Sequence, residues 1–427
     1  MTQLKLKENL LVTLKCGSAI TKVHVLKSRE TSSSQTWLEL SSPAMDALKI
    51  PDNATLLIKP ESPRVFRMGP VIGVLTFAGH VPNALKFYKA YARAARNCGM
   101  LYVFKGKSID VQNQVIEGYY YSNRENRWIE ASFPFPDAVI DKCYPNAYIS
   151  HARLEKIIGK NKIFNKKTMI DKIDFRNALV NDPVLKTHLP KTDAFTDASQ
   201  LTSMLKTFGE VFLKPLNGMK GLGIVTIKPA RPGLSGTLEC TYANHDQNIS
   251  ILINSPDEIH NILLKAAGRK RPYLIQQGIK RMEYKGGPFS IRSWAMKNGS
   301  GQWVIPGMFA KGSFGNSFLT NFTAGASLIP LQELLAYLIP LVPYTKESFM
   351  NLLKEITLKS AEVLDKKFGP LGELGFDIVF DNYGKPWIIE ANGNPGVIPI
   401  FIQKEYPLWP VLLYKYPVDY AAHLAGF

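Results

Sequence analysis

The sequence predicts a mixed fold that combines α/β and α+β parts in two or three domains. Its 427 residues suffice for that many domains of ordinary size, and a content of 45% hydrophobic and 20% charged residues is typical of globular proteins. Residues 71–104 show the pattern strand, helix, strand, which is typical of a parallel sheet covered by helices. Alternating apolar and polar positions in residues 1–60 indicate a small β-rich module.

The elements of the first half follow one another in order. Residues 61–70, ESPRVFRMGP, contain two prolines and a glycine and are predicted to be a linker. An apolar strand at 71–79, a helix at 83–99 and a strand at 100–104 form the strand-helix-strand unit. A hairpin at 115–133 and a strand at 137–144 are expected to complete this sheet.

The second half begins with a predicted helix, HARLEKIIG, and Asn165 is expected to cap the turn that follows it. A long amphipathic helix is predicted from Lys346 to about Phe368. The remaining apolar segments are predicted to be strands, at 210–229 (two strands around a turn), 272–279, 289–297, 301–312 and 374–396.

Charge and cysteine content restrict the partners and the compartment. The net charge of +17 attracts anions, but no RNA-recognition signature or zinc-finger spacing accompanies it, so no dedicated nucleic-acid partner is expected. The four cysteines are far apart and form no CxxC, which favours a reducing, cytoplasmic location over a disulfide framework. The N-terminus lacks the form of a secretory signal, and no apolar run is long enough for membrane insertion.

The stretch GKPWIIEANGNPG (384–396) predicts a metal site. Its apolar strand ends in Glu390 and Asn392, which share a face because alternate side chains of a strand point the same way. Asp377 lies on the preceding strand, and the turn at 381–385 brings it beside Glu390. Adjacent carboxylates repel unless a cation neutralises them, and oxygen ligands suit Mg²⁺. The alternative is a set of turn caps and surface ion pairs.

A glycine-rich turn between two strands is the second candidate site. Gly218, Gly221 and Gly223 allow backbone amides to approach phosphate, with Lys220 at the tip and Lys214 upstream on the strand. The turn joins strands and therefore is not a Walker loop, and hairpins also use glycine for purely conformational reasons.

Together these features resemble the ATP-grasp superfamily, from residue 160 to the end of the sequence. GPVIGVLTF, FYKAYARAAR, FPFPDAVIDKCYP, LKPLNGMKGLGI, PFSIRSW and YKYPVDYAAHLA are further similar to the endospore coat-associated YheC/YheD family. The resemblance implies an ATP-grasp fold in which two α+β subdomains clasp nucleotide, after a parallel α/β pre-ATP-grasp domain and the β-rich module. The implied domains are residues 1–65, 66–155 and 156–427, with a lid and hinge at about 205–280 and metal strands at 373–396.

The resemblance also implies roles for individual residues. The nucleotide set comprises Lys166 (or its neighbour Lys167), Lys214, Lys220, Gly221, Gln276, Gln277 and Ile279. The metal set comprises Asp377, Glu390 and Asn392, and the residues beside the γ-phosphate and the acceptor are Arg292, Lys311 and Asn321.

The function implied is that of an ATP- and Mg²⁺-binding ligase. It would join an undefined carboxylate substrate to an amine or thiol through an acylphosphate, in a sporulation setting with spore coat proteins as further partners. Three departures concern the acceptor side: Ser290 where an acidic residue is usual, Lys311 where arginine is common, and Ala324-Gly325 in place of a glycine pair. They leave open a catalytically degenerate ATP-grasp protein that serves as a structural or binding component of the coat. An anion-binding module with steep salt dependence is a third possibility.

Overall fold

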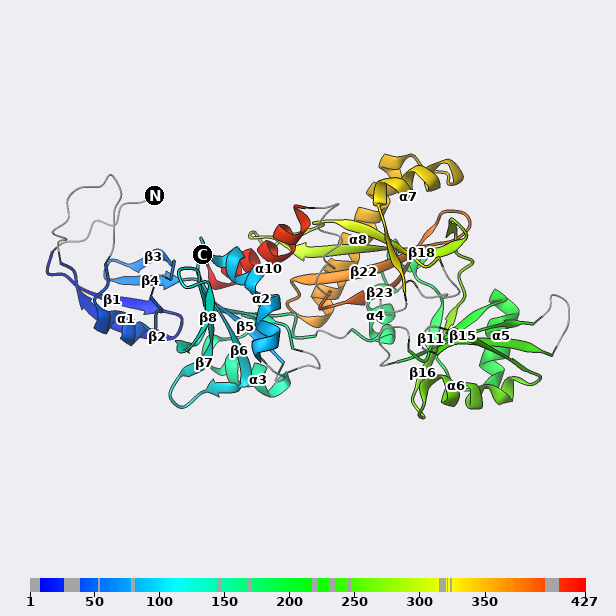
Figure 1. Ribbon diagram of the computed structural model, residues 1–427, viewed down its shortest axis with the longest axis horizontal. Helices are drawn as coiled ribbons and strands as arrows, with labels where there is room; N and C mark the ends of the chain where they lie inside the picture. The colour runs from blue at the N-terminus through cyan, green and yellow to red at the C-terminus, as the bar shows by residue number, and fades with distance from the viewer. Residues whose placement is uncertain are drawn as a thin grey trace.

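The computed structural model describes residues 8–26, 39–52, 54–77, 81–143, 147–167, 170–216, 222–230, 236–244, 247–314, 320, 322, 325–395 and 407–427. Its strands form four sheets that follow one another along an elongated molecule (Figure 1). The first sheet lies at one end, and the third sheet lies at the other. The predicted mixture of α/β and α+β parts is confirmed.

The first sheet has the order β2-β1-β4-β3. Its elements are β1 (Leu11–Cys16), β2 (Ala19–His24), α1 (Ser42–Leu48), β3 (Leu57–Ser62) and β4 (Val65–Gly69). The linker predicted at residues 61–70 is therefore wrong, because β4 is an inner strand, parallel to β1 and antiparallel to β3. Phe66 and Met68 are buried on either side of the half-buried Arg67, and this alternation of burial outweighs the turn-forming residues around it.

The second sheet has the order β10-β9-β5-β6-β7-β8. Its strands are β5 (Val71–Thr76), β6 (Met100–Asp110), β7 (Val115–Ser122), β8 (Arg127–Pro134), β9 (Ala138–Asp141) and β10 (Ile163–Phe164), and its helices are α2 (Val81–Ala95) and α3 (Tyr148–Ile158). Strands β5, β6, β9 and β10 are parallel, so the predicted strand-helix-strand unit is confirmed, as is the β7–β8 hairpin.

The third sheet is antiparallel, in the order β11-β16-β12-β13-β14-β15. Its strands are β11 (Thr192–Ala194), β12 (Val211–Pro215), β13 (Val225–Pro229), β14 (Leu238–Asn244), β15 (Gln247–Ile253) and β16 (Tyr273–Gln277). Two helices, α5 (Ala198–Phe208) and α6 (Ile259–Ala267), place their buried leucines and isoleucines in the same core as the inward side chains of β12, β13 and β16.

The fourth sheet has the order β21-β20-β18-β22-β23, with β17 and β19 added to β18. Its strands are β17 (Glu283–Tyr284), β18 (Gly287–Lys297), β19 (Trp303–Val304), β20 (Met308–Gly312), β21 (Ser327–Ile329), β22 (Glu373–Phe380) and β23 (Pro386–Asn392). Helix α8 (Lys346–Phe368) has the predicted bounds, and its buried face packs on one side of this sheet. The charged side chains of Arg292, Lys311 and Asp377 lie on the other side, whereas Lys297 at the end of β18 pairs with Asp365 of α8.

The remaining described helices lie between or beside these sheets. They are α4 (Lys172–Leu179), α7 (Leu331–Leu338), α10 (Trp409–Ala425) and the short 3₁₀ helices η1 (Leu185–His188), η2 (Pro256–Glu258) and η4 (Ile339–Leu341). Helix α10 contacts α2, β5 and β9 on one side and β18 on the other, so it links the second sheet to the fourth (Figure 1). Among the described helices, none has both the length and the apolar character needed to cross a membrane.

The predicted cap at Asn165 is wrong. Asp171 caps α4, since its side chain accepts hydrogen bonds from the amides of Ile173 and Asp174. Asn165 is fully buried, accepts from the amide of Gly372 at 2.8 Å and donates to Glu373 at 3.0 Å. Its side chain thus ties β10 to the start of β22 instead of starting a helix.

Candidate functional site

A cavity of about 110 Å³ lies between the third and fourth sheets. Its apolar walls are Phe212, Ile224, Ile279, Val379 and Ile389, and its polar lining is Lys172, Lys214, Gln276, Gln277, Arg281, Ser290, Thr320, Asp377 and Glu390. Six residues predicted to form the site therefore line one cavity: Lys214, Gln276, Gln277, Ile279, Asp377 and Glu390. An apolar slot with charged groups at its edge suits a flat ring that carries an anionic tail.

A compact charge cluster lies on the fourth sheet, across β18, β20 and β22. Arg292 is paired in register with Asp377, and Ser290 with Lys311. Arg292 donates to both carboxylate oxygens of Asp377, from Nε at 2.8 Å and from Nη2 at 3.0 Å, and Lys311 Nζ lies 3.1 Å from Oδ1. Burial alone would raise the pKa of Asp377, but the two cations outweigh it and hold the pKa well below its usual range.

This cluster changes the argument for a metal. The predicted pairing of Asp377 with Glu390 is present in the register of β22 and β23, with a bulge just beyond it. However, Arg292 and Lys311 already neutralise Asp377, so repulsion between the carboxylates does not by itself require a metal ion.

The metal donor set that fits best is therefore Glu390 with Asn392. Asn392 Nδ2 lies 3.5 Å from Glu390 Oε1, so the two side chains lie together at the end of β23. No group of three or more His, Cys, Asp or Glu side chains is placed to hold a metal within the described ranges. A carboxylate and an amide still suit Mg²⁺, which takes few protein ligands and completes its shell with water and phosphate.

Lys214 is buried on β12 and points into the cavity. Its ammonium donates to Gln276 Oε1 at 2.5 Å and lies 5.3 Å from the centre of the Phe212 ring. Burial, reinforced by the nearby charge of Lys172, lowers the pKa of Lys214 to about 7. Burial thus makes this lysine much easier to deprotonate than an exposed lysine.

The two glutamines predicted to contact adenine already have partners for their side chains. Gln276 accepts from Lys214 and donates to Thr192 Oγ1 at 2.9 Å, so it positions the lysine. Gln277 Oε1 accepts from the amide of Lys191 at 3.2 Å. Ile279 contributes an apolar wall, as a ring contact would require.

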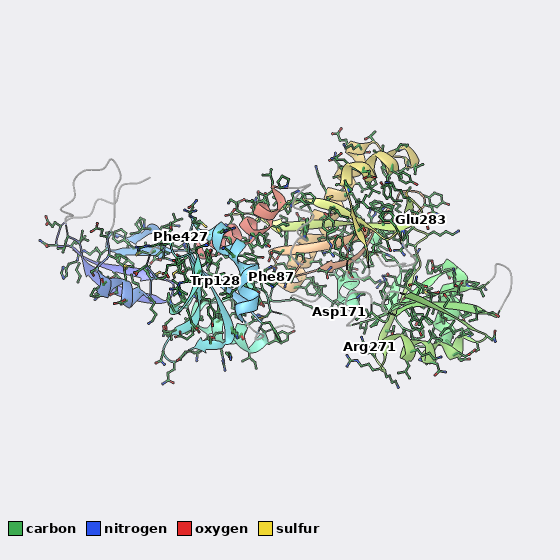
Figure 2. The ribbon with its side chains drawn as sticks, viewed as in Figure 1. Phe87, Trp128, Asp171, Arg271, Glu283 and Phe427 are labelled. Atoms are coloured by element: carbon green, nitrogen blue, oxygen red, sulfur yellow. The ribbon has the colours of Figure 1, made fainter. Side chains whose placement is uncertain are left out.

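The structure brings neither Lys166 nor Lys167 to the cavity. Lys166 pairs with Glu155 at 2.7 Å, and Lys167 pairs with Asp174 at 2.5 Å. Lys172 lines the cavity instead, directly after the cap Asp171, which Figure 2 labels at the start of α4. Asp171 followed by Lys172 was a usable signal in the sequence, because a lysine in the first turn of a capped helix has a defined direction. The expectation of a cap at Asn165 placed the helix start too early and so did not single out Lys172.

Arg281 is a second cavity residue that the sequence analysis missed. It belongs to no motif, and it is placed by an isolated bridge between residues 281 and 381. Burial lowers its pKa, but an arginine guanidinium stays protonated in proteins. Ser290 is also buried in the lining and shares a hydrogen bond of 2.8 Å with Thr320. Lys220, Gly221 and Asn321 lie outside the described residues.

Comparison with known proteins places this arrangement in a family. Residues 160–424, more than half of the chain, match the model of the YheC/D-like ATP-grasp domain. The chain belongs to the YheC/D-like ATP-grasp family. The predicted ATP-grasp fold is therefore confirmed.

Two curated relatives come from Bacillus subtilis (strain 168). The endospore coat-associated protein YheD is 28% identical over 410 residues, which are 92% of this chain and 86% of that protein. The endospore coat-associated protein YheC is 22% identical over 286 residues, 66% of this chain and 76% of that protein. Among solved structures, D-alanyl-alanine synthetase A from Vibrio cholerae O1 biovar eltor str. N16961 aligns with a TM-score of 0.47 at 14% identity, covering 83% of this chain and 98% of that one.

Proposed function

We propose that this protein is an ATP-dependent carboxylate–amine ligase that binds ATP and Mg²⁺ in the cavity between the third and fourth sheets. A carboxylate–thiol ligase would use the same first step. The observation that carries the proposal is the convergence of buried and partly buried cations on one apolar cavity. The cavity is lined by three of these cations, Lys172, Lys214 and Arg281. The other two, Arg292 and Lys311, lie on the fourth sheet and pair with the lining residue Asp377.

The adenine ring would lie between the apolar side chains of the two sheets. The phosphates would then extend toward Lys172 and Lys214, whose charges they would meet in a site with little water. Because the effective dielectric there is low, these contacts stabilise phosphate charge more than exposed lysines would. Glu390 and Asn392 would hold Mg²⁺, which supplies charge neutralisation on the phosphate oxygens when bound.

The chemical step would need positioning rather than a protein nucleophile. A substrate carboxylate attacks the γ-phosphorus, ADP leaves, and the resulting acylphosphate is then opened by the amine with loss of phosphate. Arg292 and Lys311 would stabilise the charge on the transferring group. To do so, they would have to share or exchange their contacts with Asp377.

Hydroxylamine trapping tests this proposal, because hydroxylamine converts an acylphosphate into a stable hydroxamate. The purified protein is incubated with ATP, Mg²⁺ and a panel of carboxylic acids, and ADP and hydroxamate are measured together. The proposal predicts equal amounts of both products with at least one acid, and their joint loss in Arg292→Lys. ADP release that no acid increases would count against the ligase function.

One observation favours a second candidate, a catalytically degenerate ATP-grasp protein that acts as a binding component. Both oxygens of Asp377 are held by Arg292 and Lys311, and the position two residues before the arginine is the buried Ser290. Such a protein would bind nucleotide without releasing ADP in the same assay.

The setting is also a proposal. YheD and YheC are described by their names as endospore coat-associated. We infer a similar association for this chain, with spore coat proteins as partners and synthesis in the cytoplasm. Immunodetection of the protein in coat and core fractions of spores tests this inference.

A further inference from the structure

A second and larger cavity, of about 300 Å³, lies between the second and fourth sheets. Helix α2 supplies Phe87, Tyr88 and Tyr91, α10 supplies Leu413 and Tyr414, and β18 supplies Trp294 and Met296. Figure 2 labels Phe87 on α2, beside α10. We call this the α2–α10 cavity. Its volume is at the lower end of the range for small-molecule sites.

The polar part of the α2–α10 cavity is a buried ion pair. Lys142 Nζ lies 2.5 Å from Glu373 Oε2 and 3.3 Å from Asn394 Oδ1. Glu373 is 2% exposed and also accepts hydrogen bonds from Tyr91 and Asn165. The carboxylate is thus fully engaged, and the pair contributes no net charge to the cavity.

This cavity is on the same face of the fourth sheet as the Arg292–Asp377 cluster. Every second residue of β18 lies on the same face of the sheet, which places Arg292, Trp294 and Met296 together. Their register partners on β22 are Asp377, Gly375 and Glu373, respectively. Trp294 is two residues from Arg292, about 7 Å at the rise of a strand. A ligand in the α2–α10 cavity would therefore end within reach of a group held by Arg292.

Gly375 keeps the partition between the two sites thin. A Cβ at this position would lie 2.8 Å from Arg292 Nη1 and 2.8 Å from Pro395 Cβ. Arg292 of the charge cluster and Pro395 of the α2–α10 cavity thus both lie against the backbone of Gly375. The cavity also opens beside Lys142, directly after the carboxyl end of the parallel strand β9, where ligands of open α/β sheets commonly bind.

The chemistry of the walls indicates the class of ligand. Five aromatic side chains face a cavity without net charge, and Tyr91 and Tyr414 pack edge to face with their ring centres 4.9 Å apart. Aromatic faces carry negative potential, so they attract flat apolar groups and ammonium ions and disfavour carboxylates. At the polar end, the Lys142–Glu373 pair offers no uncompensated charge to a carboxylate, whereas Asn394 Oδ1, which accepts from Lys142, has a second lone pair for an amine donor.

We propose that the α2–α10 cavity binds the acceptor of the ligase reaction, an amine with an aromatic or other large apolar body, such as an amino-acid amide or the end of a peptide. This inference rests on the proposed ligase function. In the transfer step the amine nitrogen forms a bond to the acyl carbon. The bond from that carbon to the phosphate oxygen breaks, phosphate leaves with the electron pair, and the nitrogen releases a proton.

The test is a calorimetric titration of the full-length protein with L-phenylalaninamide. Phe87→Ala removes an aromatic wall at a side chain that is 52% exposed, so this variant should fold, and Tyr414→Ala removes a second wall. Each substitution should lower the affinity for the amide roughly fivefold to tenfold, the loss expected for one aromatic contact. Affinity for an ATP analogue with Mg²⁺ should not change in either variant.

The matched control is Tyr383→Ala, which removes an exposed aromatic side chain on the turn between β22 and β23 and should leave the affinity for the amide unchanged. Two further probes test the class of ligand: 3-phenylpropionate has the same body with an acidic head, and methyl glucoside is a neutral sugar. Tighter binding of either probe than of the amide would overturn the amine assignment. Amide binding that is equal in wild type, Phe87→Ala and Tyr414→Ala would overturn the site.

The outcomes separate this inference from the proposed function. Protein that binds the nucleotide with Mg²⁺ but not the amide overturns the inference and leaves the function standing. Protein that binds the amide in an aromatic-dependent way but no nucleotide overturns the ligase function, and the acceptor role with it.

Discussion

The lowered pKa of Lys214 predicts that nucleotide binding depends on pH. In the free protein this pKa is about 7, because the ammonium is buried and close to Lys172. Bound phosphates would favour the charged lysine and return its pKa toward the ordinary value of about 10.4. Binding above pH 7 must then be accompanied by uptake of a proton.

The magnitude follows from the fraction of protonated lysine. With a pKa of about 7, roughly one tenth of the free protein is protonated at pH 8, so binding should take up about 0.9 proton. Affinity should fall roughly 20-fold between pH 7.5 and pH 9, as the protonated fraction decreases. Phosphate groups are already ionised in this range, so they add little to the slope.

Calorimetry of an ATP analogue with Mg²⁺ in buffers of different ionisation enthalpy measures both quantities. Lys214→Arg is the control, since arginine keeps its charge throughout and should remove the proton uptake. An affinity of the wild type that is constant from pH 7.5 to pH 9, with no proton uptake, would refute the role given to Lys214.

Three further predictions concern single substitutions. Asp377→Asn should lower the free energy of unfolding by about 3 kcal/mol in urea titrations, because Arg292 and Lys311 would remain buried without their counter-charge; an unchanged midpoint would mean that the ion pairs contribute little. Since the pKa of Asp377 is lowered, its contribution is present above the unfolded pKa of about 3.9 and is lost as the pH falls below it. Lys172→Met should lower the affinity for the ATP analogue about tenfold by the loss of a partly buried charge contact, whereas the matched control Lys166→Met should leave it unchanged. The reverse ranking would favour Lys166 as the nucleotide lysine, as the sequence predicted. Phe66→Ala should destabilise the protein by about 3 kcal/mol if β4 is part of the core, and a loss near zero would agree with a linker.

The fold was predictable wherever a local pattern determined the structure. The alternation in the first sheet, the strand-helix-strand unit and helix α8 were all evident in hydrophobic periodicity. The pairing of Asp377 with Glu390 was predictable because a short turn fixes the register of two antiparallel strands.

Long-range contacts were not predictable from local pattern. Asn165 has the residue type of a helix cap, but its partners Gly372 and Glu373 are more than 200 residues away. The neutralisation of Asp377 depends on which strands lie beside β22, and one sequence gives no direct information on that order. The α2–α10 cavity likewise depends on the return of α10 to the second sheet.

The measurement that tests the central claim most directly is the affinity of an ATP analogue with and without Mg²⁺, for the wild type and for Glu390→Gln. Glu390 lines the cavity at the register partner of Asp377, and glutamine keeps its shape while removing the charge that a cation would need. The account predicts Mg²⁺-dependent binding by the wild type, with the dependence on Mg²⁺ lost in Glu390→Gln and the thermal stability of the two proteins alike. Absence of binding by the wild type, or the same Mg²⁺ dependence in both proteins, would contradict it.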